Sequence, residues 1–213
     1  MLKNISISEF IEKTGSGAPT PGGGSVSALA GSLGAALNVM VYELTQGKKV
    51  YNEFEPELRM KLDDSAEKLQ DISRQLLIEM ENDTTAFDSV MEAFKMPKET
   101  EEEKIIRGDA IQEGYKKAIE VPLKIANLSL EALFLMEVLS IHGNVNAITD
   151  VGVGTLLSYV GVEGALLNVK INLNSMKKGD YTADVEGKID EILNIAKDTR
   201  SLIMRNVYNR LEA

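Results

Sequence analysis

Residues 18–31, Ala-Pro-Thr-Pro-Gly-Gly-Gly-Ser-Val-Ser-Ala-Leu-Ala-Gly, join a proline- and glycine-rich turn to the start of a helix of small residues. Pro19 and Pro21 favour an extended entry, and Ser25 is a good N-cap for a helix that begins at Val26. The glycines leave backbone N–H groups open at the helix N-terminus, which favours an anionic or carbonyl-bearing ligand. Because the run matches neither common nucleotide-binding pattern, an ordinary loop is the alternative.

The helix that follows has several residues with little or no side chain: Ser27, Ala28, Ala30, Gly31, Gly34, Ala35 and Ala36. Another helix or a flat ligand must therefore approach it closely.

Further along the chain, apolar residues recur with the helical period. The pattern predicts helices over residues 7–14, 26–44, 57–96, 100–121, 123–141, 151–176 and 185–207, with Pro122 kinking or restarting the chain between the fourth and fifth. Residues 169–173 also alternate as a strand would, but a lone strand would have no partner. We therefore expect an all-α helical bundle of about seven to nine helices.

Composition narrows the class of protein. The 213 residues carry 23 Lys and Arg against 33 Asp and Glu, a formal net charge of -10, which argues against nucleic-acid or acidic-membrane partners. The chain has no cysteine and one histidine, so we expect no metal site. Residues 1–4 lack an apolar signal core, and the apolar run 26–41 is shorter than the roughly 20 residues of a membrane span. We expect one domain, residues 1–213, in the cytoplasm.

One residue interrupts the apolar stripe of the helix over residues 57–96. Steps of three or four residues from Leu69 reach Met80, then Asp83, then Phe87, so a carboxylate occupies a position where the pattern calls for a hydrophobe. Loss of water around it would raise its pKa, which suits a proton-transfer group. The equally weighted alternative is a structural anion that bonds a helix end or a lysine.

The acidic run 99–103 is most simply a solvated first helical turn.

Polar residues also gather after residue 141. Asn168 and Asn172 are four residues apart, on one face of a helix with apolar neighbours. Neutral amides on an apolar wall suit a heteroaromatic ligand with its own donors and acceptors. The segment 141–150 holds His142, Asn144 and Asp150, each of which also has an ordinary helix-capping or breaking use. His142 has no neighbouring carboxylate or serine, which favours a structural role.

Several of these segments together resemble the formiminotetrahydrofolate cyclodeaminase family, which also contains methenyltetrahydrofolate cyclohydrolases. The resemblance covers nearly the whole chain and rests on residues 19–26, 34–37, 47–49, 83–87, 96–98, 143–144, 150 and 168–173. It implies an all-α homodimer that binds a reduced folate in a cleft between subunits or helices. It also implies no cofactor beyond the tetrahydrofolate derivative used as substrate, and a formiminotransferase partner supplied by a separate chain.

The resemblance further implies a reaction and a set of site residues. N10 of 5-formiminotetrahydrofolate attacks the formimino carbon, ammonia leaves and 5,10-methenyltetrahydrofolate forms, with Asp83 as the proton acceptor. Lys48 and Lys49 are candidates for the folate glutamate tail, or are solvated lysines at a helix end. The full set of expected substrate-binding residues is Pro21, Gly22, Gly23, Gly24, Ser25, Lys48, Lys49, Asn144, Asp150, Asn168 and Asn172. The alternatives are a cyclohydrolase that gives 10-formyltetrahydrofolate and a non-catalytic folate-binding module.

Overall fold

The computed structural model describes residues 1–212, which form helices and no strand. The α-helices are α1 (Ile7–Thr14), α2 (Gly23–Gln46), α3 (Lys49–Glu53), α4 (Pro56–Lys95), α5 (Glu101–His142), α6 (Ile148–Leu173) and α7 (Asp180–Leu211). Two 3-10 turns, η1 (Leu2–Asn4) and η2 (Val145–Ala147), complete the elements of this part of the chain. The all-α bundle expected from the sequence is confirmed, and its seven helices fall within the expected number.

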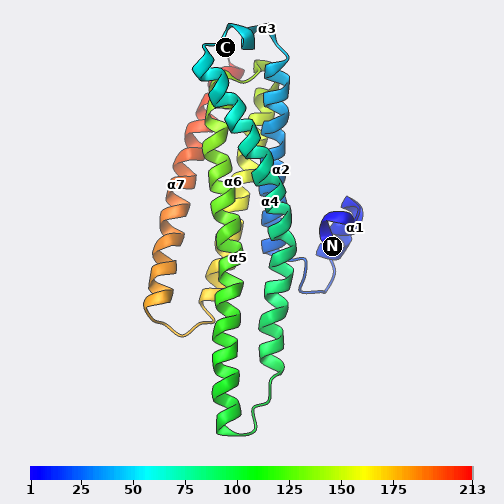
Figure 1. Cartoon of the computed structure of the whole chain (residues 1–213), viewed down its shortest axis with the longest axis vertical. Helices are drawn as coiled ribbons and strands as arrows, with labels where there is room; N and C mark the ends of the chain where they lie inside the picture. The colour runs from blue at the N-terminus through cyan, green and yellow to red at the C-terminus, as the bar shows by residue number, and fades with distance from the viewer. Residues whose placement is uncertain (213) are drawn as a thin grey trace.

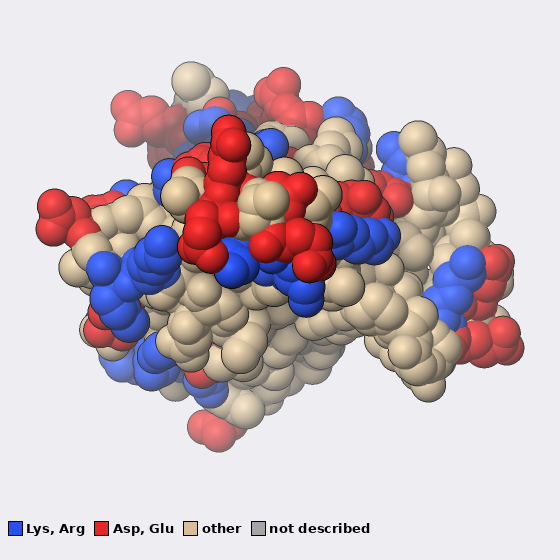
Figure 2. All heavy atoms as spheres, turned by 90° about the horizontal axis from the view of Figure 1, so that it is seen from below, with Lys and Arg blue, Asp and Glu red and all other residues tan. Residues whose placement is uncertain are grey.

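The long helices lie roughly along one axis (Figure 1). α5 packs against α2, α4, α6 and α7, whereas α1 stands to the side of the bundle, near the start of α2. The lower parts of α4 and α5 extend beyond the other helices as a hairpin. Acidic side chains gather at its tip (Figure 2), where Thr100 caps α5 and Glu101, Glu102 and Glu103 occupy the first turn. This solvated acidic turn is the arrangement expected from the sequence.

Two of the helix boundaries that differ from those expected affect the site described below. α2 begins at Gly23 rather than Val26, so Gly22 occupies the N-cap position and Ser25 lies inside the first turn, fully buried. α5 runs unbroken from Glu101 to His142 with Pro122 in its interior, instead of ending there. Proline at this position removes one backbone donor, and packing of α5 against α2, α4, α6 and α7 stabilises the helix in spite of that loss.

Small residues bring α2 and α6 into close contact. The two helices are antiparallel, because Gly23 lies beside Asn168 at one end while Gly34 lies beside Ser158 further along. A Cβ placed on Gly161 would lie only 3.1 Å from the Cα of Gly31. A side chain there would push the backbone of α2 away by a few tenths of an ångström, so glycine at these positions allows the two helices to lie this close.

Three helical segments are long and apolar enough to cross a membrane by length and composition alone: α2, α5 and Val145–Leu173. The apolar run 26–41, judged too short for a span, is part of α2, which is 24 residues long, and two further segments outside that run also reach this length. At least half of each apolar window is buried against the rest of the bundle. Much of the apolar character of these segments therefore serves helix packing.

The α2–α6 contact gives a stability prediction. A Cβ at Gly154 would lie 2.8 Å from the carbonyl oxygen of Gly34 and would overlap the amide of Asn38. Gly154→Ala should therefore lower the free energy of unfolding by about 1–3 kcal/mol in a urea titration. Gly187 of α7 has no atom within 4 Å of the same position, so Gly187→Ala should raise it by roughly 0.5–1 kcal/mol. Equal effects of the two substitutions would contradict this account of the packing.

Candidate functional site

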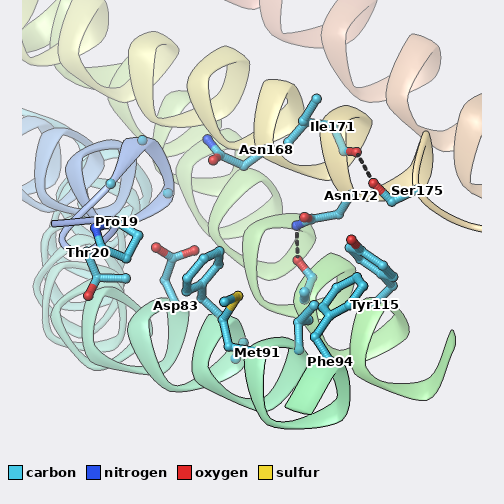
Figure 3. Close-up of a pocket in the computed structure, with 17 residues that line it drawn as sticks. Pro19, Thr20, Asp83, Met91, Phe94, Tyr115, Asn168, Ile171, Asn172 and Ser175 are labelled. Atoms are coloured by element: carbon cyan, nitrogen blue, oxygen red, sulfur yellow. Dashed lines mark hydrogen bonds between the residues drawn. The ribbon is translucent and has the colours of Figure 1, made fainter. Parts of the chain in front are cut away.

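A pocket of about 340 Å³ lies where α2 begins and α6 ends, with α4 and α5 forming its other walls (Figure 3). This volume lies in the range of small-molecule sites. The turn before α2 contributes Pro19 and Thr20 to its rim. Among the expected site residues, the pocket brings together Gly22, Gly23, Gly24, Asp83, Asn168 and Asn172. Residues about 145 positions apart in the chain therefore share one cavity.

Asp83 is the charged residue of this pocket and points into it from α4 (Figure 3). The Ser25 hydroxyl donates to Asp83 Oδ2 at 2.9 Å and also lies 3.2 Å from the carbonyl oxygen of Met80. Burial raises the pKa of the Asp83 carboxyl above its ordinary value of 3.8, and hydrogen bonding from Ser25 opposes part of that rise. The carboxylate thus bonds the first turn of α2, which is the helix-end contact of the structural alternative, rather than a lysine.

Gly24 makes this placement of Asp83 possible. A Cβ on Gly24 would overlap the Asp83 carboxylate. Gly23, one residue earlier, has the same relation to α6, since a Cβ there would lie 3.0 Å from Nδ2 of Asn168. The glycine run therefore does more than leave backbone N–H groups open: it makes room for two polar side chains that arrive from other helices.

The amides of Asn168 and Asn172 are oriented by backbone carbonyl groups. Asn168 Nδ2 donates to the carbonyl of Gly164 at 2.8 Å, and Asn172 Nδ2 donates to that of Ala118 at 2.7 Å. In a regular α-helix the N–H of residue 122 would occupy the Ala118 carbonyl, but Pro122 has no N–H to donate. The proline thus leaves a carbonyl for Asn172, and each amide retains its Oδ1 as an acceptor for a ligand.

An apolar wall continues from Asp83 along α4 to α5, and the sequence analysis did not assign it to the site. It consists of Phe87, Met91 and Phe94 from α4 and Tyr115 from α5. Phe87 and Phe94 are 36% and 43% exposed, although their spacing on α4 suggested core positions. The signal that could have found them is their place on the same stripe as Asp83, beyond the point where the other helices cover α4.

Four expected site residues do not lie at this pocket within the chain. Lys48 and Asn144 line a separate hollow of about 300 Å³ at the opposite end of α2, where the Asn144 amide donates to the carbonyl of Leu44. Lys49 forms an exposed ion pair with Glu53, and Asp150 is in the first turn of α6 at that same end. α2 alone is about 36 Å long, so these four side chains are too far away to reach Asp83.

Two further expected residues lie behind the pocket rather than on its surface. Ser25 is fully buried and acts on the site through Asp83, and Pro21 is buried after a cis Thr20–Pro21 peptide bond.

His142 lies at the far hollow, with its ring edge-on to Phe54 at 5.9 Å between ring centroids. Burial and then the nearby Arg210 and Lys61 lower the pKa of His142. This setting agrees with the structural role favoured for His142.

Known proteins are similar to this chain in both fold and sequence. The profile described as formiminotransferase-cyclodeaminase matches residues 6–191. The methenyltetrahydrofolate cyclohydrolase of Methylorubrum extorquens is 39% identical over 213 residues, which cover 100% of this chain and 99% of that protein. The formimidoyltransferase-cyclodeaminase of Mus musculus is 32% identical over 99% of this chain, which spans 38% of that protein's length. The crystal structure of formiminotetrahydrofolate cyclodeaminase from Thermotoga maritima superposes with a TM-score of 0.79 at 25% identity, covering 100% of this chain and 98% of that one.

The fold, the pocket and these similarities define the chain as a member of a class of folate-processing enzymes. Within that class, the chain belongs to the formiminotransferase-cyclodeaminase family. The resemblance inferred from the sequence motifs is confirmed.

The contact between Gly24 and Asp83 gives a prediction that needs no substrate. Gly24→Ala should push the carboxylate away from Ser25 and towards water. The carboxylate then loses both the burial that raises its pKa and the Ser25 hydrogen bonds that lower it, and because burial is the larger cause, the pKa of Asp83 should fall towards its ordinary value of 3.8. Carboxyl NMR titration of protein with ¹³C-labelled aspartate measures this change. Gly108→Ala on α5, where no atom lies within 4 Å, is the matched control and should leave the Asp83 titration unchanged. An unshifted Asp83 in a folded Gly24→Ala protein would refute the proposed contact.

Proposed function

We propose that this protein converts 5-formiminotetrahydrofolate to 5,10-methenyltetrahydrofolate and releases ammonia. The observation that carries this proposal is the position of Asp83, a partly dehydrated carboxylate with a raised pKa, in a pocket beside a glycine-rich turn. Ring closure requires N10 to lose a proton as it attacks the formimino carbon. The tetrahedral intermediate then expels its exocyclic nitrogen as ammonia, after that nitrogen gains a proton. One carboxyl group of raised pKa suits both transfers.

The remaining walls of the pocket match the rest of a reduced folate. The free Oδ1 atoms of Asn168 and Asn172 are acceptors for the N–H groups of the pterin ring. Phe87, Phe94 and Tyr115 offer apolar surface to the aromatic bridge that carries N10. Gly23 and Gly24 line the pocket with backbone alone, so a ligand beside Asp83 and Asn168 can approach the chain closely there.

A second candidate reaction is the opening of 5,10-methenyltetrahydrofolate by water to give 10-formyltetrahydrofolate. The full-length similarity to the Methylorubrum extorquens cyclohydrolase favours it. Both reactions pass through a tetrahedral carbon between N5 and N10, so the same carboxylate would serve either. The similarity to the Thermotoga maritima cyclodeaminase over 98% of that chain supports the first reaction.

We also propose the setting in which the reaction takes place. The protein acts in the cytoplasm as a homodimer, without a cofactor other than its folate substrate, and a formiminotransferase on a separate chain supplies 5-formiminotetrahydrofolate. The net charge of -10 supports the absence of nucleic-acid partners. The exposed apolar faces of α2 and α6 support self-association.

The direct experiment offers both substrates in parallel. With 5-formiminotetrahydrofolate, ammonia release and the methenyl absorbance should rise together at equal rates. With 5,10-methenyltetrahydrofolate, faster loss of the methenyl absorbance above the uncatalysed rate would instead establish the cyclohydrolase. Binding of both folates without turnover of either would reject both reactions in favour of a folate-binding module.

Asp83→Asn is the substitution that tests the proton-transfer role. The amide keeps the shape of the side chain but accepts no proton, so turnover should fall about 100-fold to 10,000-fold while folate still binds. The free energy of unfolding at neutral pH should stay the same or rise, because a partly buried carboxylate without a cation destabilises the fold. Asp88→Asn, at an exposed position on the same helix, is the control and should keep full turnover. Full turnover by folded Asp83→Asn protein would contradict the role.

The pH dependence follows from the same group. A base acts only when deprotonated, so kcat/KM should fall as the pH is lowered through the raised pKa of Asp83, above its ordinary value of 3.8. Stability should change in the opposite direction, because the folded state binds this proton more tightly than the unfolded state and gains stability as the pH falls through that pKa. Asp83→Asn should remove both effects. An acid limb of the pH–rate profile at the ordinary carboxylate pKa would contradict this assignment.

A further inference from the structure

The pocket beside Asp83 holds a single formal charge. Its 17 lining residues, all within residues 1–212, include that carboxylate and no lysine, arginine or histidine. The side chain that bonds the Asp83 carboxylate is the neutral hydroxyl of Ser25, at 2.9 Å. Glu79, one helical turn earlier on α4, is instead paired with Lys124 of α5 at 2.6 Å. Within the described part of the chain, Asp83 therefore lacks the counter-ion that Glu79 has, and a bound cation would supply one.

Three aromatic rings line the pocket beside this carboxylate. Phe87 follows Asp83 by one helical turn, on the same face of α4, and Phe94 and Tyr115 lie further along (Figure 3). The rings of Phe94 and Tyr115 meet edge to face, with 6.4 Å between their centroids and 83° between their planes. We call these three residues the aromatic wall. Because the face of an aromatic ring carries partial negative charge, the aromatic wall attracts positive charge as the carboxylate does.

Phe94 already has a cation against its ring. The guanidinium carbon of Arg107 lies 5.5 Å from the centre of the Phe94 ring, and Nη2 of Arg107 donates to the Phe94 carbonyl at 3.1 Å. Arg107 is not among the residues that line the pocket, so its charge does not compensate Asp83 inside it. The contact shows which kind of cation this part of the protein accepts, namely a planar one with delocalised charge.

An amidinium group combines the properties that the two sides of the pocket require. Its parallel N–H groups match the two oxygens of a carboxylate, as those of a guanidinium do, and its flat face stacks on aromatic rings. A compact ammonium ion is more strongly hydrated and is less suited to such a wall. The chemistry of the pocket therefore favours a delocalised nitrogen cation over both an anion and a neutral group.

We propose that the pocket is a site for amidinium cations, which bind between the Asp83 carboxylate and the aromatic wall. The extension to folates rests on the proposed function. A formimino group is an amidine that carries a positive charge at neutral pH, and the 5,10-methenyl bridge is an amidinium whose charge is shared by N5 and N10. A formyl group is neutral. The charge of the one-carbon unit thus decides which reduced folates bind tightly, since the pterin and glutamate parts are the same in all three.

Benzamidinium and benzamide test the cation site without any folate, because they are a flat cation and a neutral compound of the same shape. We expect benzamidinium chloride to bind about tenfold more tightly than benzamide or better, and to shift the Asp83 carboxyl signal of protein with ¹³C-labelled aspartate. Asp83→Asn should remove the difference in affinity, whereas Asp88→Asn, at an exposed position on α4, should keep it. Equal affinities in the wild type, or an Asp83 signal that does not move at the solubility limit of benzamidinium, would overturn the proposal.

Phe87→Leu tests the aromatic wall. Leucine keeps an apolar side chain but removes the ring face, so benzamidinium should bind about twofold to thirtyfold more weakly, with a smaller loss for benzamide. Tyr115→Phe keeps the ring and should bind benzamidinium as the wild type does. An equal loss of both compounds in Phe87→Leu, or no loss of either, would overturn the role of the wall in selecting cations.

Two folates with the same number of carbon atoms extend the test: 5,10-methenyltetrahydrofolate, a cation at the one-carbon unit, and 5-formyltetrahydrofolate, which is neutral there. Stopped-flow quenching of tyrosine fluorescence measures both dissociation constants before turnover. In the wild type, the methenyl compound should bind about tenfold more tightly or better, and Asp83→Asn should bring the two values together. Equal binding by wild type that turns over its substrate would overturn charge selection and leave the proposed function intact. Benzamidinium bound at Asp83 in a protein that binds neither folate would refute the proposed function and leave the cation site intact.

Discussion

The close approach of the first turn of α2 to α4 and α6 is the constraint on which the site depends. Gly24 leaves room for the Asp83 carboxylate, and Gly23 leaves room for the Asn168 amide. Ser25, the next residue of α2, is buried and supplies the hydroxyl that donates a hydrogen bond to Asp83. A side chain at either glycine would separate these groups. The absence of a Cβ in the first turn of α2 therefore determines where the Asp83 carboxylate of α4 can lie.

In the same region, a side chain of α6 takes the place of a backbone hydrogen bond that α5 lacks. Pro122 removes a backbone hydrogen bond in α5, and the vacant carbonyl of Ala118 accepts the Asn172 amide from α6. Both the proline and the asparagine would be unfavourable alone, since each is a poor residue for a helix interior. Together they leave no vacant acceptor and fix an amide oxygen at the pocket. The helix ends supply the glycines and amides of the site, and the middle of α4 supplies its carboxylate.

Helical period predicted most of the fold and the position of Asp83, because both depend on the spacing of apolar residues along one helix. The helical period did not predict that α5 continues through Pro122, because the rule that proline ends or kinks a helix takes no account of the contact with α6. It also missed Phe87 and Phe94 as site residues, because a stripe shows which face is apolar but not where its covering helices end. Lys48 and Asn144 were grouped with Asp83 by resemblance alone. Their distance along α2 shows that a family motif can combine residues that a single chain keeps apart.

A structure of the protein with 5-formyltetrahydrofolate, a stable compound with a formyl group on N5 in place of the formimino group, tests the central claim most directly. We expect N10 within hydrogen-bond distance of the Asp83 carboxyl, about 2.6–3.2 Å, with the pterin ring against Asn168 and Asn172. The glutamate should lie at the open end of the pocket. A folate bound in another hollow, or one whose N10 points away from Asp83, would contradict the account.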